Sequence, residues 1–147
     1  MVKALFYVEG EKAPVQHEGC RMIITTQLIN EGITKVGAFN LPDGRVEVVF
    51  EGDEEKLIAI HKEIKDNLYA WMKAKAADAE ALRKRIGNPG VIVSDLEFND
   101  NLLVLDIGLF SHSLTFDQIY KGVSVYKELA VALTGLNETI KTFKEKP

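Results

Sequence analysis

The chain has 147 residues, of which 46% are hydrophobic and 27% charged, a composition typical of a soluble globular protein. Its formal net charge of −4 disfavours a nucleic-acid backbone as the main partner. No apolar run approaches the roughly 20 residues that a membrane-spanning helix needs. We therefore expect a single domain over residues 1–147, with neither nucleic acid nor membrane among its partners. The single cysteine, Cys20, excludes an internal disulfide and is typical of a cytoplasmic protein.

The first 32 residues predict a strand, a loop and a helix. Residues 3–9 form a short run of aromatic and aliphatic residues, which favours a first strand over a signal sequence. Proline, glycines and charges predict a loop over 10–19, and a helical pattern follows over 20–31. Gly32 stands where a glycine often ends a helix. The predicted apolar stripe of this helix consists of Met22, Ile24, Leu28 and Ile29.

A β-hairpin is predicted over residues 34–51. The strand 34–40 leads into Leu41-Pro42-Asp43-Gly44, where the proline presets φ and the glycine can take the left-handed conformation of a three-residue connection. The next strand alternates in polarity. Its two faces carry Val46, Val48 and Phe50, and Glu47, Val49 and Glu51.

The middle of the chain predicts a helical region followed by two strands. Asp53 is a candidate N-cap, and the apolar residues after it recur at helical spacing, namely Leu57, Ile60, Ile64 and Leu68. The alanine-rich run 70–85 either extends this helix or forms a second one after a bend. Residues 91–98 and 102–109 predict two further strands, separated by a turn.

A second well-marked helix is predicted over residues 115–133, where Thr115 and Gln118 form a capping box. One face of this helix is apolar, with Phe116, Ile119, Tyr120, Val123, Tyr126, Ala130 and Leu133. A last short helix is predicted to about Lys144. The resulting βαββαβ order predicts an α+β, ferredoxin-like sandwich, with an antiparallel sheet, helices on one face and additional C-terminal strand and helices.

Two segments carry the candidate chemistry. Residues 15–21 end a loop and open the first helix, where backbone N–H groups can hold an anion. Arg21 adds a planar, permanently charged guanidinium that suits a phosphate or carboxylate. Asn40 lies at the end of a strand, beside the tight turn. Together these residues predict a small anion-binding site for a phosphate group.

The two segments resemble the motifs of the acylphosphatase family. That family has a loop of the form Gly-x-Val-Gln-Gly-Val-Gly-Phe/Tyr-Arg before its first helix, and then an asparagine before a hairpin turn with Gly-x-Val. The matching residues of the first motif are Val15, Gln16, Gly19 and Arg21, and those of the second are Asn40, Gly44 and Val46. The resemblance covers residues 3–66 well and residues 91–98 loosely.

The resemblance implies a core at residues 3–66 and 91–109, a helical insertion at 67–90 and a C-terminal helical extension at 115–145. It also implies hydrolysis of small acyl phosphates without a metal or cofactor. Arg21 would bind the phosphoryl oxygens, and Asn40 would orient the attacking water. The phosphate-binding loop would comprise Val15, Gln16, His17, Glu18, Gly19 and Cys20.

Departures from the family pattern leave a second function open. His17, Glu18 and Cys20 replace a glycine, a small apolar residue and an aromatic residue, and Ala13-Pro14 stands where a glycine precedes Val-Gln. A Glu18 carboxylate aimed at a bound anion from about 5 Å would repel it by roughly 3 kcal/mol, whereas solvent would screen most of this repulsion. The alternative is a non-catalytic binding or regulatory module, in which the C-terminal helices bind a partner or form a homodimer.

Overall fold

The computed structural model describes residues 1–16, 19–87, 90–110, 114 and 134. The chain divides into two units, Met1–Ser111 and His112–Pro147, and every element described below belongs to the first. The helix predicted over 115–133 and the short helix after it lie outside the described residues, as does most of the predicted extension 115–145.

The described strands form one antiparallel sheet in the order β4-β1-β3-β2-β6, with β5 also paired to β1. Its strands are β1 (Val2–Gly10), β2 (Lys35–Asn40), β3 (Val46–Gly52), β4 (Val91–Val93), β5 (Glu97–Phe98) and β6 (Leu105–Asp106). Since β1 and β2 both run antiparallel to the central strand β3, they point in the same direction. This arrangement is the one that the predicted βαββαβ order requires.

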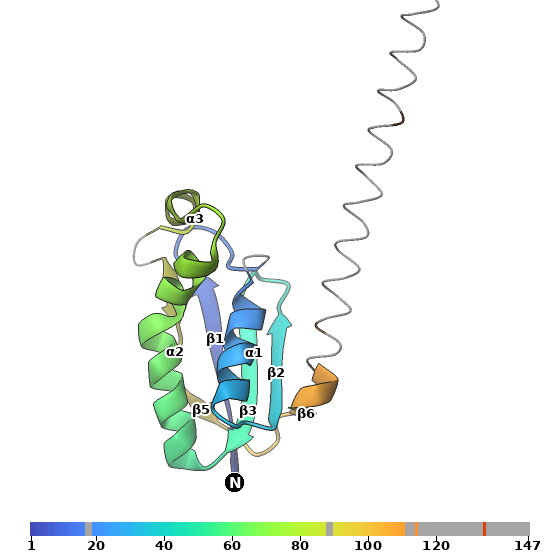
Figure 1. The fold of residues 1–147 in the computed structure, drawn as a ribbon. Helices are drawn as coiled ribbons and strands as arrows, with labels where there is room; N and C mark the ends of the chain where they lie inside the picture. The colour runs from blue at the N-terminus through green and yellow to red at the C-terminus, as the bar shows by residue number, and fades with distance from the viewer. Residues whose placement is uncertain (17–18, 88–89, 111–113, 115–133, 135–147) are drawn as a thin grey trace, which may run out of the picture. The chain divides into compact units, whose positions relative to one another are not determined.

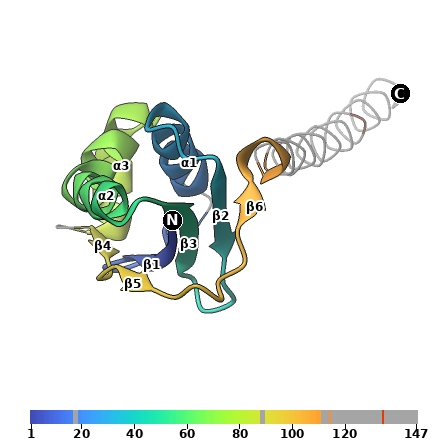
Figure 2. The same ribbon diagram turned by 90° about the horizontal axis from the view of Figure 1, so that it is seen from below.

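Three described helices cover one face of this sheet (Figures 1 and 2). They are α1 (Cys20–Asn30), α2 (Glu54–Lys75) and α3 (Ala79–Ile86). The alanine-rich run 70–85 therefore both extends the preceding helix and forms a second one. Helix α2 continues to Lys75, and α3 follows after a bend. The predicted α+β, ferredoxin-like fold is confirmed, and the described part of residues 67–90 includes the end of α2 and all of α3.

The core lies between the helices and the sheet. The apolar stripe predicted for the helix at residues 20–31 is wrong in two of its residues. Met22 and Ile29 are 46% and 49% exposed, while Ile23 and Thr25 are buried in their place. Helix α1 packs against both β2 and α2, so its buried side is centred on Ile24. Met22 and Ile29 lie outside this buried side. The Thr25 hydroxyl donates to the Arg21 carbonyl oxygen at 2.7 Å, which satisfies this buried polar group.

The β2–β3 hairpin has the predicted connection. Gly44 has φ of +93° and donates its N–H to the Leu41 carbonyl oxygen at 3.1 Å. Leu41 N–H in turn donates to the Arg45 carbonyl oxygen at 2.8 Å, which closes the turn. A left-handed residue at this position is the glycine conformation that a three-residue hairpin connection uses.

The strand predicted over residues 91–98 is interrupted. β4 ends at Val93, and pairing with β1 resumes at Glu97 with the register shifted by one residue, from Val8↔Val93 to Ala4↔Phe98. Ser94 explains the interruption, because its side-chain oxygen accepts the Tyr7 N–H at 2.7 Å in place of a backbone carbonyl. The extra residue makes this a β-bulge.

The strand predicted over residues 102–109 is shorter than expected. Only Leu105–Asp106 pairs with β2, and residues 107–110 are already helical. The Asp106 carboxylate accepts the N–H groups of Gly108 and Leu109 at 2.9 and 3.2 Å. It thus acts as the cap of a helical turn, which ends the strand. The segment between β5 and β6 crosses the sheet on the side away from the helices (Figure 2).

Candidate functional site

The topology brings the two predicted segments to one edge of the sheet. Because β1 and β2 run in the same direction, their carboxyl ends lie at the same edge. The loop after β1 leads into the first turn of α1, and β2 ends at Asn40 (Figure 1). Arg21, the second residue of α1, and Asn40 therefore come from elements that meet at this edge.

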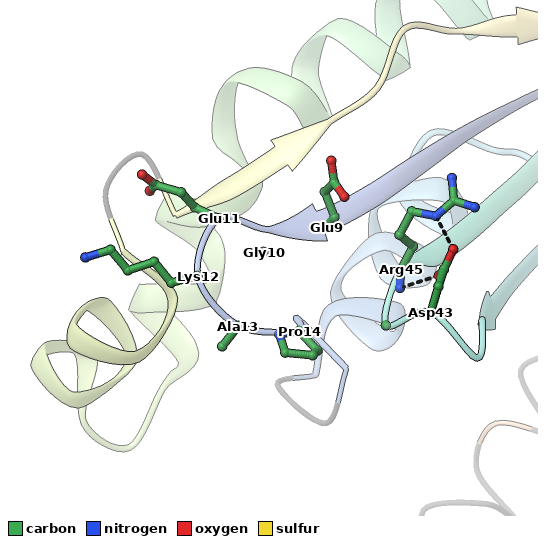
Figure 3. A pocket seen from close by; sticks show the side chains of 9 residues that line it. Glu9, Gly10, Glu11, Lys12, Ala13, Pro14, Asp43 and Arg45 are labelled. Carbon is green, nitrogen blue, oxygen red and sulfur yellow. Dashed lines mark hydrogen bonds and ion pairs between the residues drawn. The ribbon is translucent and has the colours of Figure 1, made fainter.

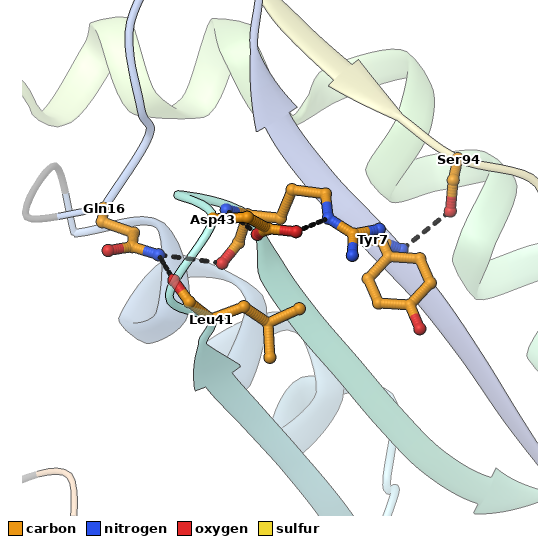
Figure 4. Close-up of polar contacts among 6 residues, drawn as sticks. Tyr7, Gln16, Leu41, Asp43 and Ser94 are labelled. Carbon is orange, nitrogen blue, oxygen red and sulfur yellow. Dashed lines mark hydrogen bonds and ion pairs between the residues drawn. The ribbon is translucent and has the colours of Figure 1, made fainter.

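The Gln16 side chain links the loop to the hairpin. Its Nε2 donates to the carbonyl oxygens of Leu41 and Arg45, at 2.7 and 2.9 Å (Figure 4). Pro14 adds an apolar contact with the same turn, since a Cβ on Gly44 would lie 3.3 Å from Pro14 Cγ. These contacts hold the chain entering the candidate phosphate loop against the hairpin that follows Asn40.

The start of α1 has an uncapped N-terminus. Gly19 occupies the N-cap position with φ of +79°, and it brings no side chain that could accept the first N–H groups of the helix. A left-handed residue followed by a helical one turns successive N–H groups toward a common point. No acidic residue lies in the first turn of α1. The positive end of the helix dipole lies at these N–H groups, next to Arg21.

The side chains of the other described loop residues contact the core or the hairpin. Val15 is fully buried and Cys20 is 2% exposed, so both belong to the core, while the Gln16 amide binds the hairpin. Only the backbone of these residues is therefore available to an anion. His17 and Glu18 lie outside the described residues. The assignment of residues 15–20 to phosphate binding stays a prediction.

Asn40 presents a buried polar atom that needs a partner. It alternates along β2 with Val36 and Ala38, which are 0% and 1% exposed, so its side chain lies on the helix-covered face. Among the described residues, Asn40 Oδ1 is the buried side-chain polar atom without a hydrogen-bond donor. Because an unsatisfied buried acceptor is costly, this oxygen is suited to receive a hydrogen bond from a water or a ligand.

Cys20 is unsuited to nucleophilic chemistry. Burial raises the pKa of its thiol from about 9 to about 12, an effect larger than the lowering caused by the neighbouring Arg21 charge. The thiol therefore stays protonated near neutral pH, and the thiolate is the reactive form. Cys20 is therefore a small buried residue of the core.

We expect the native Cys20 thiol to resist a disulfide-exchange reagent at pH 8 and to react fully once the chain is unfolded in urea. The unfolded chain loses this proton near pH 9 and the folded chain near pH 12, so the free energy of unfolding falls as the pH rises through this window. Absorbance of the released thiolate measures the reaction. Stoichiometric labelling of the folded protein, within the mixing time, would contradict the expectation.

A pocket of about 200 Å³ lies beside the candidate site without including Arg21 or Asn40. It is lined by residues 9–14 and 43–45, which carry three carboxylates and two cations (Figure 3). Arg45 is committed within it, because its Nε donates to Asp43 Oδ2 at 2.8 Å and its guanidinium lies 4.2 Å from the centre of the Tyr7 ring. The lining carries more negative than positive charge, which does not favour a phosphate there.

His61 has a structural role in the bulge. His61 Nε2 lies 2.7 Å from the Ser94 carbonyl oxygen, and its ring is 5.2 Å from the Phe6 ring, so it helps to hold the bulge on the core. In the described part of the chain, no group of His, Cys, Asp and Glu side chains could hold a metal ion. No described helix is long and apolar enough to cross a membrane.

Two solved structures are similar to this chain. An acylphosphatase from Bacillus subtilis has 20% sequence identity and a TM-score of 0.43, over 70% of this chain and 89% of its own. An acylphosphatase from Coxiella burnetii has 17% identity and a TM-score of 0.37, over 71% of this chain and 86% of its own. No family model matches the sequence, and no curated protein matches it.

Proposed function

We propose that this protein hydrolyses small acyl phosphates at the edge where α1 begins and β2 ends. The proposal is carried by Asn40 Oδ1, which is buried, has no donor among the described residues, and lies at the same sheet edge as the α1 N-terminus. Helix α1 offers N–H groups and the Arg21 guanidinium to a phosphate, and Asn40 at the end of β2 offers an acceptor to a water. Both are the groups that the acylphosphatase motifs require.

Phosphate binding is assigned to the first turn of α1 and to Arg21. The N–H groups following Gly19 and the positive end of the helix favour an anion, and the Arg21 guanidinium can bind two phosphoryl oxygens at once. As the phosphoryl group is transferred, charge is spread over its equatorial oxygens. Donors fixed by a helix and by a loop held to the hairpin stabilise that charge without reorganising.

Water attack is assigned to Asn40. A water that donates one hydrogen to Asn40 Oδ1 has a lone pair free to attack phosphorus. A new P–O bond forms to the water oxygen, the bond from phosphorus to the acyl oxygen breaks, and the electron pair leaves with the carboxylate. The water proton passes to solvent or to the product phosphate. The carboxylate is a stable anion at neutral pH, so the leaving group needs no general acid.

The test is hydrolysis of benzoyl phosphate by the wild-type chain and by Asn40→Ala. We expect kcat to fall by about 10²-fold with KM little changed, because Asn40 positions the water and does not hold the substrate. Asn30→Ala is the matched control, since Asn30 is exposed at the end of α1. Wild-type turnover no faster than that of Asn40→Ala would refute the proposed function.

A further inference from the structure

The end of the helical insertion is bonded directly to the chain that enters the candidate phosphate loop. Glu11 N–H donates to the Gly90 carbonyl oxygen at 2.8 Å, and Lys12 N–H donates to the Ile86 carbonyl oxygen at 3.0 Å. The Glu11 carboxylate also accepts the Gly90 N–H at 3.1 Å. Three hydrogen bonds thus join residues 86–90 to residues 11–12, nearly 80 positions earlier in the chain.

Within the insertion, Tyr69 of α2 holds the chain that follows α3. Its hydroxyl donates to the Gly87 carbonyl oxygen at 2.7 Å. Its ring lies against Gly90 so closely that a Cβ at that position would overlap the ring. Leu82 and Ile86 of α3 are 5% and 0% exposed, so the helix is packed into the core and is not a loose appendage. The insertion is therefore a fixed support.

Between residue 12 and α1, two of the described residues hold the chain to the hairpin. Pro14 contacts the hairpin at Gly44, and Gln16 donates to the carbonyls of the same hairpin. The loop therefore has one anchor on the hairpin that follows Asn40 and a second on the insertion. It also has Ala13-Pro14 where the acylphosphatase motif has a glycine, so its course depends on these anchors.

We propose that the insertion is a brace that sets the position of the phosphate-binding loop, with Glu11 and Tyr69 as its positioning residues. The proposal rests on the function proposed above for the same site. Glu11 and Tyr69 touch no substrate in this account. They act by restricting the motion of residues 11–16, and thereby of the N–H groups at the start of α1.

The test compares four variants of the full chain. Glu11→Ala removes the acceptor of Gly90 N–H, whereas Glu11→Gln keeps a side-chain oxygen that can accept it. Tyr69→Phe removes only the hydroxyl bonded to Gly87. Glu80→Ala is the control, because Glu80 pairs with Arg83 on the exposed side of α3 and touches neither anchor.

Two measurements decide the proposal. Hydrogen exchange of the Ile23 amide, which donates to the Gly19 carbonyl oxygen at 3.0 Å, reports how firmly the start of α1 is held. Competition by inorganic phosphate against benzoyl phosphate hydrolysis reports binding at the site. For Glu11→Ala and Tyr69→Phe we expect about 3–10-fold faster exchange, with KM and the phosphate inhibition constant raised by a similar factor. Glu11→Gln should restore both values, and Glu80→Ala should leave both unchanged.

An exchange rate of the Ile23 amide in Glu11→Ala and Tyr69→Phe that equals the rate in Glu80→Ala would overturn the brace, even if these variants lower the midpoint of unfolding. This outcome is separable from failure of the proposed function. If the wild-type chain does not hydrolyse benzoyl phosphate, the exchange measurement still supports the brace when Glu11→Ala accelerates exchange and Glu11→Gln does not. Equal exchange in those two variants and the wild type overturns it.

Discussion

Replacing Arg21 by alanine is expected to lower kcat/KM for benzoyl phosphate by about 10²–10³-fold, the range found when one preorganised donor to a developing charge is lost. Arg21 is half-buried at the second position of α1, next to the N–H groups that follow Gly19. Its guanidinium supplies the only formal positive charge in the first turn of that helix. Since the proposed contact with the phosphate is also made in the ground state, KM should rise as kcat falls.

Two further variants define what Arg21 contributes. Arg21→Lys keeps the charge without the planar pair of donors, so its activity should lie between those of wild type and Arg21→Ala. Arg83→Ala removes an exposed arginine that is paired with Glu80, and it should leave activity unchanged. Steady-state kinetics with benzoyl phosphate measures all three. Equal kcat/KM values for Arg21→Ala and Arg83→Ala would show that Arg21 binds no reacting group.

The second large effect concerns stability. Phe6→Ala is expected to lower the free energy of unfolding by about 3–5 kcal/mol, because it leaves a cavity at the centre of the core. Phe6 is 0% exposed on β1. Its ring meets that of Phe50 edge-on, with centroids 5.9 Å apart at 88°, and lies 5.2 Å from His61. The substitution therefore removes contacts to the central strand and to α2 together.

Urea unfolding followed by circular dichroism measures this effect. Ile58→Ala is the matched control, because Ile58 lies on α2 with 48% of its surface exposed, and its loss should cost under about 1 kcal/mol. A midpoint for Phe6→Ala equal to that of Ile58→Ala would show that the sheet and α2 do not share one core. That result would also undermine the placement of the site, which depends on this packing.

The sequence predicted the first half of the fold well because its signals there are local. The alternation at residues 46–51 and the helical spacing after Asp53 each depend on residues close together in the chain. The turn at Gly44 is of the same kind, since one left-handed residue sets its geometry. Asp53 does occupy the predicted N-cap position, although its side chain makes no cap hydrogen bond.

The errors arose where distant residues decide the local structure. Ser94 interrupts the strand at 91–98 because it bonds to Tyr7, which is 87 positions away. Met22 and Ile29 are apolar, yet the packing of α1 against two neighbours selects other residues for burial. Asp106 gave a local signal for a helix cap, but the apolar residues around it resemble a strand.

The sequence indicated which segments form the candidate site, but not the hydrogen bonds that hold those segments in place. Residue spacing was enough to single out 15–21 and Asn40, which the topology places at one sheet edge. No sequence pattern indicates that the Gln16 side chain binds the hairpin, or that Tyr69 and Glu11 form hydrogen bonds with Gly87 and Gly90 of the insertion. These bonds join residues 18 to 79 positions apart, so only the folded chain reveals them.

The central claim is that the start of α1 and Asn40 form one phosphate site. The most direct measurement is a titration of the 15N-labelled chain with inorganic phosphate, followed by amide chemical shifts. We expect saturable shifts at Gly19, Cys20 and Arg21 and at the Asn40 side-chain amide, all with one dissociation constant and all lost in Arg21→Ala. No saturable shift at these groups, or shifts confined to residues 9–14 and 43–45, would contradict it.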